Sequence, residues 1–271
     1  MADVQQSLRA RLLNGARAYG LMLMSGSHIV TELLAGLGYD CLIVDHEHSP
    51  VDVSTGVGML QAIAAGDRLC TPIVRVPAPD DPVYLKKVLD TLKPPAGLLV
   101  PMVETREQAE MVVSACRYPP NGTRGCAHKY VRASHWGMDE NYTTAAVQDI
   151  LICVQVESAA AVDRISEIAV DGVDAIFLGP FDLSCSVGKM GQFSDPVVQA
   201  LLTRAEEAVL ASGKLLTGFR SPDRDLADMY TAGYSLVCGG VELGVLRQAA
   251  LADVACATEA MKETCRKEAA L

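Results

Sequence analysis

The sequence contains few aromatic residues, no long hydrophobic run and no arrangement of cysteines that suggests disulfides. Aromatic residues make up 5% of the 271 residues, so the core must consist mainly of aliphatic side chains and methionine. No hydrophobic run approaches the ~18 residues that indicate a membrane span. Residues 1–6 lack the apolar segment of a secretory signal. We therefore expect a cytoplasmic protein that has no membrane partner.

The nine cysteines indicate a protein that has no disulfides and no cysteine-based zinc site. Their number is odd, and no pair has the Cys-x-x-Cys spacing of redox or zinc motifs. Cys41, Cys153 and Cys238 lie in apolar runs, where cysteine acts as a small hydrophobic residue. The formal net charge of −10, with no readable basic groove, disfavours nucleic acid as a partner.

Eight short apolar runs, most of them followed by a helical stretch, predict an α/β protein. Eight such units within this length predict one (β/α)8 TIM barrel formed by residues 1–271 as a single domain. An open doubly wound sheet is the alternative, but the segment after the first run lacks its glycine-rich phosphate turn. The expected strands are Tyr19–Met24, Cys41–Asp45, Thr71–Val76, Gly97–Val103, Ile150–Glu157, Ala175–Gly179, Leu215–Gly218 and Leu236–Gly240. The expected helices include His28–Leu37, Asp81–Leu92, Arg106–Arg117, Ala159–Ile168, Asp195–Ala211 and Asp223–Thr231, with one or two more after Leu243.

Polar side chains occur where several of these strands end, which is where barrel enzymes place their reactive groups. Glu157 and Asp182 are about one strand–helix unit apart, so they would lie at the ends of adjacent strands. Two carboxylates with open positions beside them suit Mg²⁺ or Mn²⁺. The structural alternative is that Asp182 caps the following helix.

The segment Asp45-His46-Glu47-His48 carries a candidate general base. If the second strand continues through it, His46 and His48 share one face, with Asp45 and Glu47 on the other. A histidine close to a carboxylate suits proton transfer near neutral pH. The alternative is that His48 is a solvent-exposed histidine at the end of the strand, with no part in catalysis.

Arg75 ends an otherwise apolar strand, and its planar guanidinium suits a substrate carboxylate or enolate oxygen. The structural alternative is that Arg75 forms an ion pair with Glu47 or Glu157. The ion pair and the contact with substrate are compatible with each other. No strand end supplies the lysine that a Schiff-base aldolase needs. Carbon–carbon chemistry at this site would therefore use a metal ion.

Taken together, these segments resemble the HpcH/HpaI aldolase family, which comprises metal-dependent pyruvate aldolases. The resemblance runs from Leu8 to about Leu251. It is carried above all by Val44-Asp45-His46-Glu47-His48, Val74-Arg75, Gln155-Val156-Glu157 and Gly179-Pro180-Phe181-Asp182-Leu183-Ser184.

The resemblance implies a class II aldolase, an aldehyde-lyase that cleaves 4-hydroxy-2-oxo acids reversibly to pyruvate and an aldehyde. Glu157 and Asp182 would bind the divalent cation, which would be Mg²⁺ or Mn²⁺, with Co²⁺ as a further candidate. Small-molecule 2-oxo acids and aldehydes would be its partners. The family also implies a homo-oligomer, a trimer or hexamer, in which the C-terminal helices are exchanged between subunits.

The same resemblance implies roles for the remaining polar residues. Arg75 would hold the pyruvyl carboxylate, and His48, oriented by Asp45, would be the acid–base residue. Gln155 and the backbone beside Phe181 and Asp182 would line the pyruvate pocket.

Two other functions stay open beside this one. The first is a related lyase or decarboxylase that forms a pyruvate-type enolate from citrate-like or CoA-ester substrates. The second is a non-catalytic barrel that binds 2-oxo acids. The segment Gly125–Met138 is not easily matched to the family, and we expect it to influence the aldehyde side. Its basic residues favour an acidic or polyhydroxylated acceptor, unless it is a solvated loop.

Overall fold

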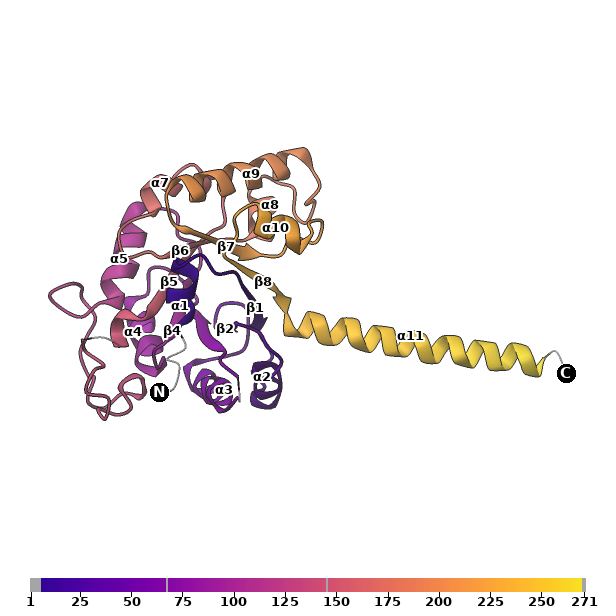
Figure 1. Ribbon diagram of the computed structural model, residues 1–271. Coiled ribbons are helices and arrows are strands. Elements are labelled where there is room, and N and C mark those ends of the chain that lie inside the picture. The colour runs from indigo at the N-terminus through magenta and orange to yellow at the C-terminus, as the bar shows by residue number, and fades with distance from the viewer. Residues whose placement is uncertain (1–5, 67, 145, 270–271) are drawn as a thin grey trace.

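The computed structural model describes residues 6–66, 68–144 and 146–269 (Figure 1). Residues 1–5, on which the prediction of no secretory signal largely depends, lie outside the described residues. Eight parallel strands close into one barrel in the order β1 to β8. The predicted (β/α)8 barrel is confirmed.

The strands and helices follow the predicted alternation along the chain. The strands are β1 (Ala18–Leu23), β2 (Cys41–Asp45), β3 (Thr71–Arg75), β4 (Ala96–Val100), β5 (Ile150–Val156), β6 (Ala175–Leu178), β7 (Leu215–Phe219) and β8 (Leu236–Val241). The helices are α1 (Leu8–Leu13), α2 (His28–Ala35), α3 (Val53–Ala65), α4 (Pro82–Thr91), α5 (Arg106–Cys116), α6 (Ala159–Val162), α7 (Ile165–Ile168), α8 (Pro180–Ser186), α9 (Pro196–Ala211), α10 (Leu226–Thr231) and α11 (Glu242–Glu268), with 3₁₀ helices η1 (Arg132–Ser134) and η2 (Ala146–Gln148).

Three expected elements differ from the structure by three or more residues at one end or by being divided, whereas the other boundaries shift by at most two residues. β4 ends at Val100 rather than Val103, because Met102 takes a left-handed backbone conformation with φ 51° that a strand cannot accommodate. The expected helix Ala159–Ile168 is two short helices, since Arg164 leaves helical geometry with ψ 11°. α10 begins at Leu226 instead of Asp223, because Asp225 supplies the N-cap by accepting from the Ala227 N–H at 3.0 Å.

The strands bury side chains on both faces, and this separates two layers of core. In β2, Cys41 and Ile43 belong to the cluster inside the barrel, whereas Leu42 and Val44 belong to the cluster between strands and helices. The alternation follows from the two-residue period of a strand. The same alternation places the side chain of Asp45, the last residue of β2, on the side that faces the barrel interior.

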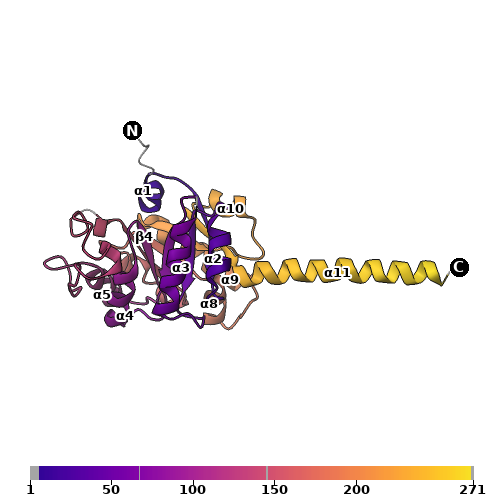
Figure 2. The same cartoon turned by 90° about the horizontal axis from the view of Figure 1, so that it is seen from below.

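The C-terminal tail forms a single helix, α11, that extends away from the barrel (Figures 1 and 2). Apart from the buried Glu242 at its start, the helix is largely exposed, and its exposed residues include Leu246, Leu251, Val254 and Met261. Within the described ranges, no helix combines the length and apolar character needed to cross a bilayer.

Candidate active site

The inward-facing rows of three strands end in polar side chains. Asp45 and Arg75 are register partners at the ends of β2 and β3, and Gln155 pairs in register with Phe177 of β6. Each follows an inward-facing apolar residue two positions earlier, namely Ile43, Ile73 and Cys153. Strand geometry thus gathers these polar groups over one end of the barrel core.

Asp45 organises the turn after β2. Its Oδ1 accepts hydrogen bonds from Arg75 Nε at 2.7 Å and from the Glu47 backbone N–H at 3.0 Å. Its Oδ2 accepts from the His48 backbone N–H at 3.2 Å. Asp45 is fully buried, and these donors replace its hydration. It therefore fixes the backbone that carries Glu47 and His48, and its contact with His48 is through the backbone rather than the ring.

The two histidines of this segment lie in different environments, contrary to the shared face expected for a continuing strand. β2 stops at Asp45, so the two-residue alternation does not apply beyond it. His46 is buried, with Nδ1 at 3.0 Å from the Tyr84 hydroxyl. The His48 side chain is 65% exposed, and its Nε2 lies 3.6 Å from Glu47 Oε1. Only the His48 ring is accessible to a bound substrate.

Arg75 pairs with two carboxylates of the same turn. Besides its bond to Asp45, its Nη1 lies 3.0 Å from Glu47 Oε2. The ion pair expected as the structural alternative is therefore present with Glu47. Arg75 nevertheless also lines the pocket described below, so the pairing and a substrate contact are compatible.

Glu157 follows β5 directly and is held by two donors. Its Oε2 accepts from the Met102 backbone N–H at 3.0 Å, which accounts for the left-handed turn after β4. Its Oε1 accepts from the Gln155 amide. The carbonyl oxygen of this buried amide has no hydrogen-bond partner among the described residues, which leaves an acceptor for a bound molecule. A Cβ on Gly179 would lie 2.9 Å from Glu157 Oε1, so a side chain at this position would have to displace the Glu157 carboxylate.

Negative charge is concentrated around Glu157. Burial raises the pKa of Glu157 to about 7, and the Asp182 and Glu47 carboxylates add to the rise. Burial likewise raises the pKa of Glu47 to about 7, although Arg75 opposes it. Because Arg75 is the one cation among the charged groups that shift these two pKa values, a divalent cation would offset the repulsion.

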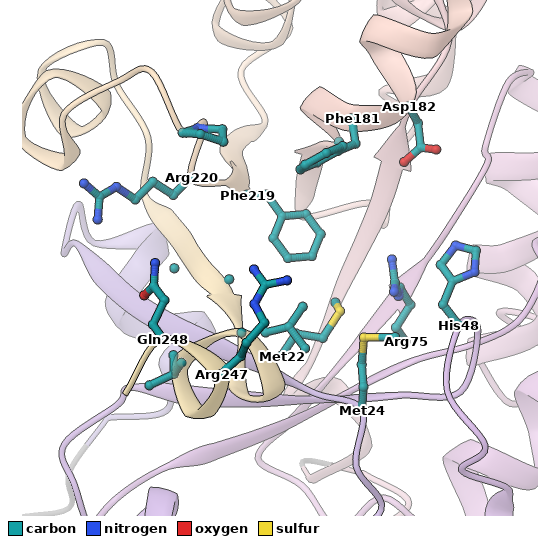
Figure 3. A pocket seen from close by; sticks show the side chains of 17 residues that line it. Met22, Met24, His48, Arg75, Phe181, Asp182, Phe219, Arg220, Arg247 and Gln248 are labelled. Carbon is teal, nitrogen blue, oxygen red and sulfur yellow. The ribbon is translucent and has the colours of Figure 1, made fainter. Parts of the chain in front are cut away.

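Asp182 lies in the first turn of α8, directly after β6. No side-chain hydrogen bond caps α8 among the residues described, so the expected structural alternative for Asp182 finds no support. Figure 3 shows its carboxylate on the same side of the pocket as His48 and Arg75.

The donor set fits a hard divalent cation that keeps open positions. In the described part of the chain, no group of three or more His, Cys, Asp and Glu side chains is arranged to hold a metal ion. Glu157 and Asp182 alone would leave most of an octahedral shell to water and substrate, as is common for Mg²⁺.

A cavity of about 710 Å³ lies at the same end of the barrel, and its lining includes Asp182 but not the buried Glu157 and Gln155. His48, Arg75, Phe181 and Asp182 line one part of it (Figure 3). Among the described residues, no lysine lines this cavity, which agrees with the absence of a Schiff-base lysine at the strand ends. The volume is within the range of small-molecule sites.

The segment Gly125–Met138 does not contribute to this cavity, contrary to the expectation that it lies on the aldehyde side. It belongs to the connection from α5 to β5, which enters a strand at its amino end and so lies at the opposite face of the barrel. Its Arg132 donates to the Thr91 carbonyl at the end of α4.

Several pocket residues were missed by the sequence reasoning. Met24, Phe219, Arg220 and Arg247 come from the ends of β1 and β7 and from α11. Arg220 directly follows β7, so the rule that polar residues at strand ends mark the site would have found it. Nothing local in the sequence indicates that Arg247, in a C-terminal helix, lies over the barrel.

Comparisons with known proteins agree with this architecture. The family model described as HpcH/HpaI aldolase/citrate lyase matches residues 18–249. The chain belongs to this family. It is 40% identical over 244 residues to a hydroxypyruvate/pyruvate aldolase of Chromohalobacter salexigens, covering 89% of this chain and 94% of that protein. It is 38% identical to a 4-hydroxy-2-oxo-heptane-1,7-dioate aldolase of Shigella boydii, covering 91% and 93%.

A solved structure gives the same result for the fold. The crystal structure of a member of this family from Burkholderia cenocepacia superimposes with a TM-score of 0.86 at 36% identity. The match covers 91% of this chain and 97% of that one. The resemblance noted from the motifs is therefore confirmed over nearly the whole chain.

Proposed function

We propose that this protein is a metal-dependent aldolase that cleaves 4-hydroxy-2-oxo acids to pyruvate and an aldehyde, and that also joins the two in reverse. The observation that carries the proposal is that His48, Arg75 and Asp182 line one cavity at the carboxyl end of the barrel. Glu157 is buried beside it, close enough for the charges of Asp182 and Arg75 to shift its pKa. Family membership and the names of the relatives agree with a carbon–carbon lyase.

Glu157 and Asp182 are the residues proposed to hold the cation, which would be Mg²⁺ or Mn²⁺, with Co²⁺ as a third candidate. A divalent cation at this place would supply Lewis acidity toward the oxygens of the 2-oxo acid. Glu157 is oriented for this role by the Met102 N–H and the Gln155 amide.

The chain's own residues account for the rest of the reaction. Arg75 binds the carboxylate end of the substrate and stabilises the negative charge that develops on the pyruvate half. His48 accepts the proton of the 4-hydroxyl as the C3–C4 bond breaks, so that C4 becomes the aldehyde carbon. The electron pair of that bond stays on the pyruvate half, which takes up a proton at C3.

The other residues act by position. Asp45 is a positioning residue that holds the turn carrying His48 and aligns Arg75. The backbone around Phe181 would line the pyruvate end of the pocket. The buried Gln155 would reach the bound acid only through its unpartnered carbonyl oxygen. Phe181 stacks edge-on against Phe193, with ring centroids 4.7 Å apart, which restricts its ring beside the cavity.

We further propose a cytoplasmic homo-oligomer, a trimer or hexamer built on a single barrel domain. The proposal is supported by α11, whose exposed apolar residues have no partner within the described chain. Exchange of α11 between subunits would cover them.

The experiment that tests the activity measures pyruvate released by the purified protein from a panel of 4-hydroxy-2-oxo acids, with and without EDTA. We expect turnover that EDTA abolishes and that added Mg²⁺ or Mn²⁺ restores. Absence of turnover across the panel, combined with retained binding of 2-oxo acids, would instead support the non-catalytic barrel. Turnover of a citrate-like or CoA-ester substrate alone would support the related lyase.

A further inference from the structure

A second cavity, of about 350 Å³, lies at the face of the barrel opposite to the proposed reaction centre. It is lined by residues of α3, the residue after Leu92 and residues of η1 and the turn that follows it, namely Gln61, Ala64, Ala65, Lys93, Arg132, His135 and Trp136. α3 and α4 lead into the amino ends of β3 and β4, away from the carboxyl ends of the strands. In Figure 1 the connection from α5 to β5, which carries η1, extends from the barrel on the side of α4. None of the lining residues has a role in the proposed aldolase reaction.

Arg132 is half-buried at this cavity without a counter-charge. Its Nη1 donates to the Thr91 carbonyl at 2.5 Å, which uses one of the five guanidinium donors. Burial lowers the pKa of Arg132, and no acidic group of the described chain opposes that shift. At Arg9 the hydrogen bond to Asp174 raises the pKa although burial opposes it. A half-buried cation that lacks such a partner is costly, and an anion in the cavity would offset the cost.

Lys93 adds a second cation to the cavity. Its Nζ donates to His135 Nε2 at 2.5 Å, which holds the ammonium group beside the lining of the cavity. Within the described residues, neither Lys93 nor Arg132 forms an ion pair, although the chain has a net charge of −10. An ammonium and a guanidinium group that line one cavity suit a phosphate or a carboxylate.

Trp136 provides an aromatic wall for the same cavity. It is the only tryptophan of the chain, and its side chain is 58% exposed. Its ring stacks on the His135 imidazole, with centroids 6.4 Å apart and planes at 13°. Both residues have φ 54°, a left-handed conformation that is costly for side chains of this size. The turn thus accepts backbone strain and leaves an indole at the surface, where it can stack on a bound ring.

We infer that this cavity binds a small molecule in which a planar ring carries an anionic group, either a nucleotide or an aromatic carboxylic acid. Arg132 and Lys93 bind the anionic group, and Trp136 stacks on the ring. Gln61 offers an amide donor and acceptor to the edge of the ring, and the volume is within the range of small-molecule sites. The site is separate from the proposed active site, and the inference does not depend on the aldolase proposal.

The fluorescence of Trp136 tests the inference directly, because no other tryptophan contributes to the signal. The full chain is titrated with adenosine monophosphate, adenosine, inorganic phosphate, phenylacetate and phenylacetamide, and calorimetry measures each Kd. We expect a saturable change in fluorescence with adenosine monophosphate or phenylacetate. Its Kd should be lower by about tenfold or more than that of the matching neutral compound and that of phosphate alone. Whether adenosine monophosphate or phenylacetate binds more tightly identifies the source of the ring.

Variants assign the binding to this cavity. Arg132→Gln and Lys93→Gln should each raise the Kd of the preferred probe by about tenfold. Trp136→Asn removes the ring while keeping a residue that tolerates the left-handed backbone, and calorimetry should show a similar loss. Lys87→Gln, an exposed residue of α4 outside the cavity, is the matched control and should bind like the parent.

Two results would overturn the inference. The first is a Kd for the anionic probes that equals the Kd of the neutral ones, or that stays unchanged in both Arg132→Gln and Lys93→Gln. The second is an indole that acrylamide fails to quench in the ligand-free protein, because Trp136 would then be covered by another subunit. Neither result bears on the aldolase proposal, which the release of pyruvate tests separately.

Discussion

Asp45 and Arg75 are register partners at the ends of β2 and β3, and Arg75 Nε donates to Asp45 Oδ1 at 2.7 Å. Both side chains are buried, so the guanidinium can rotate little. Its Nη1 reaches Glu47 while the residue still lines the cavity. The planar group is therefore aligned before substrate arrives, which lowers the cost of binding a carboxylate.

Replacing Arg75 by lysine tests this alignment. Lysine keeps the charge but cannot contact Asp45, Glu47 and a substrate carboxylate with one planar group. We expect Arg75→Lys to lower kcat/KM by about 100-fold while leaving Mn²⁺ affinity intact. Steady-state kinetics and Mn²⁺ calorimetry provide the two measurements. Unchanged kcat/KM would show that Arg75 is a structural ion pair only.

Removing either proposed ligand should abolish metal binding. In Glu157→Gln and Asp182→Asn the side-chain shape is kept but the charge is lost. We expect Mn²⁺ affinity to fall by more than about 100-fold in each, and turnover to fall with it. Glu167→Gln, an exposed residue of α7, is the matched control. Unchanged Mn²⁺ affinity in both variants would place the metal elsewhere.

His48 should contribute to turnover but not to binding. Its exposed ring lies beside Glu47 and lines the cavity without contributing to the buried core. We expect His48→Gln to bind Mn²⁺ and pyruvate like the parent and to lose about 10²- to 10⁴-fold in kcat. His128→Gln, in the connection from α5 to β5, serves as the control. Parent-like kcat in His48→Gln would exclude the acid–base role.

Gly179 provides a test of the metal site that leaves every charged group in place. An added Cβ would lie 2.9 Å from Glu157 Oε1 and 3.2 Å from its Cγ. Glu157 could move aside only by losing its bonds to Met102 and Gln155. We expect Gly179→Ala to weaken Mn²⁺ binding by about tenfold or more. Gly36→Ala, where the new Cβ would have only an ordinary contact at 3.5 Å, should bind Mn²⁺ normally.

His46 should make the fold sensitive to acid. Burial lowers the pKa of His46, so the folded state favours its neutral form. Its contribution to stability is therefore present above the ordinary histidine pKa of about 6.5 and is lost as the pH falls below that value. Urea unfolding of the parent and His46→Gln should give free energies that differ more at about pH 7.5 than at about pH 5.5. A difference that stays constant, or widens in acid, would contradict this.

The barrel and the residues at its strand ends could be predicted because they depend on local periodicity. The inward-facing row that ends at Asp45 follows directly from the two-residue repeat of β2. The environments of His46 and His48 could not be predicted from this repeat, because they depend on the residue at which β2 ends. That point is set by the hydrogen bonds of Asp45 to the following turn.

Contacts between segments distant in the sequence set the remaining differences. The segment Gly125–Met138 is expected from the sequence to influence the aldehyde side, but its place between α5 and β5 puts it at the other face. Arg247 reaches the cavity because Glu242 binds the end of β1, a contact across more than 200 residues of sequence. Residue type alone could not indicate either arrangement.

The proposed aldolase activity depends on Glu157 and Asp182 together holding one divalent cation. The most direct measurement is a crystal structure of the protein soaked in Mn²⁺ and pyruvate, with anomalous diffraction data to locate manganese. We expect an anomalous peak in contact with both carboxylates and pyruvate density between that peak and Arg75. Carboxylates that point apart, with no manganese at either one, would contradict it.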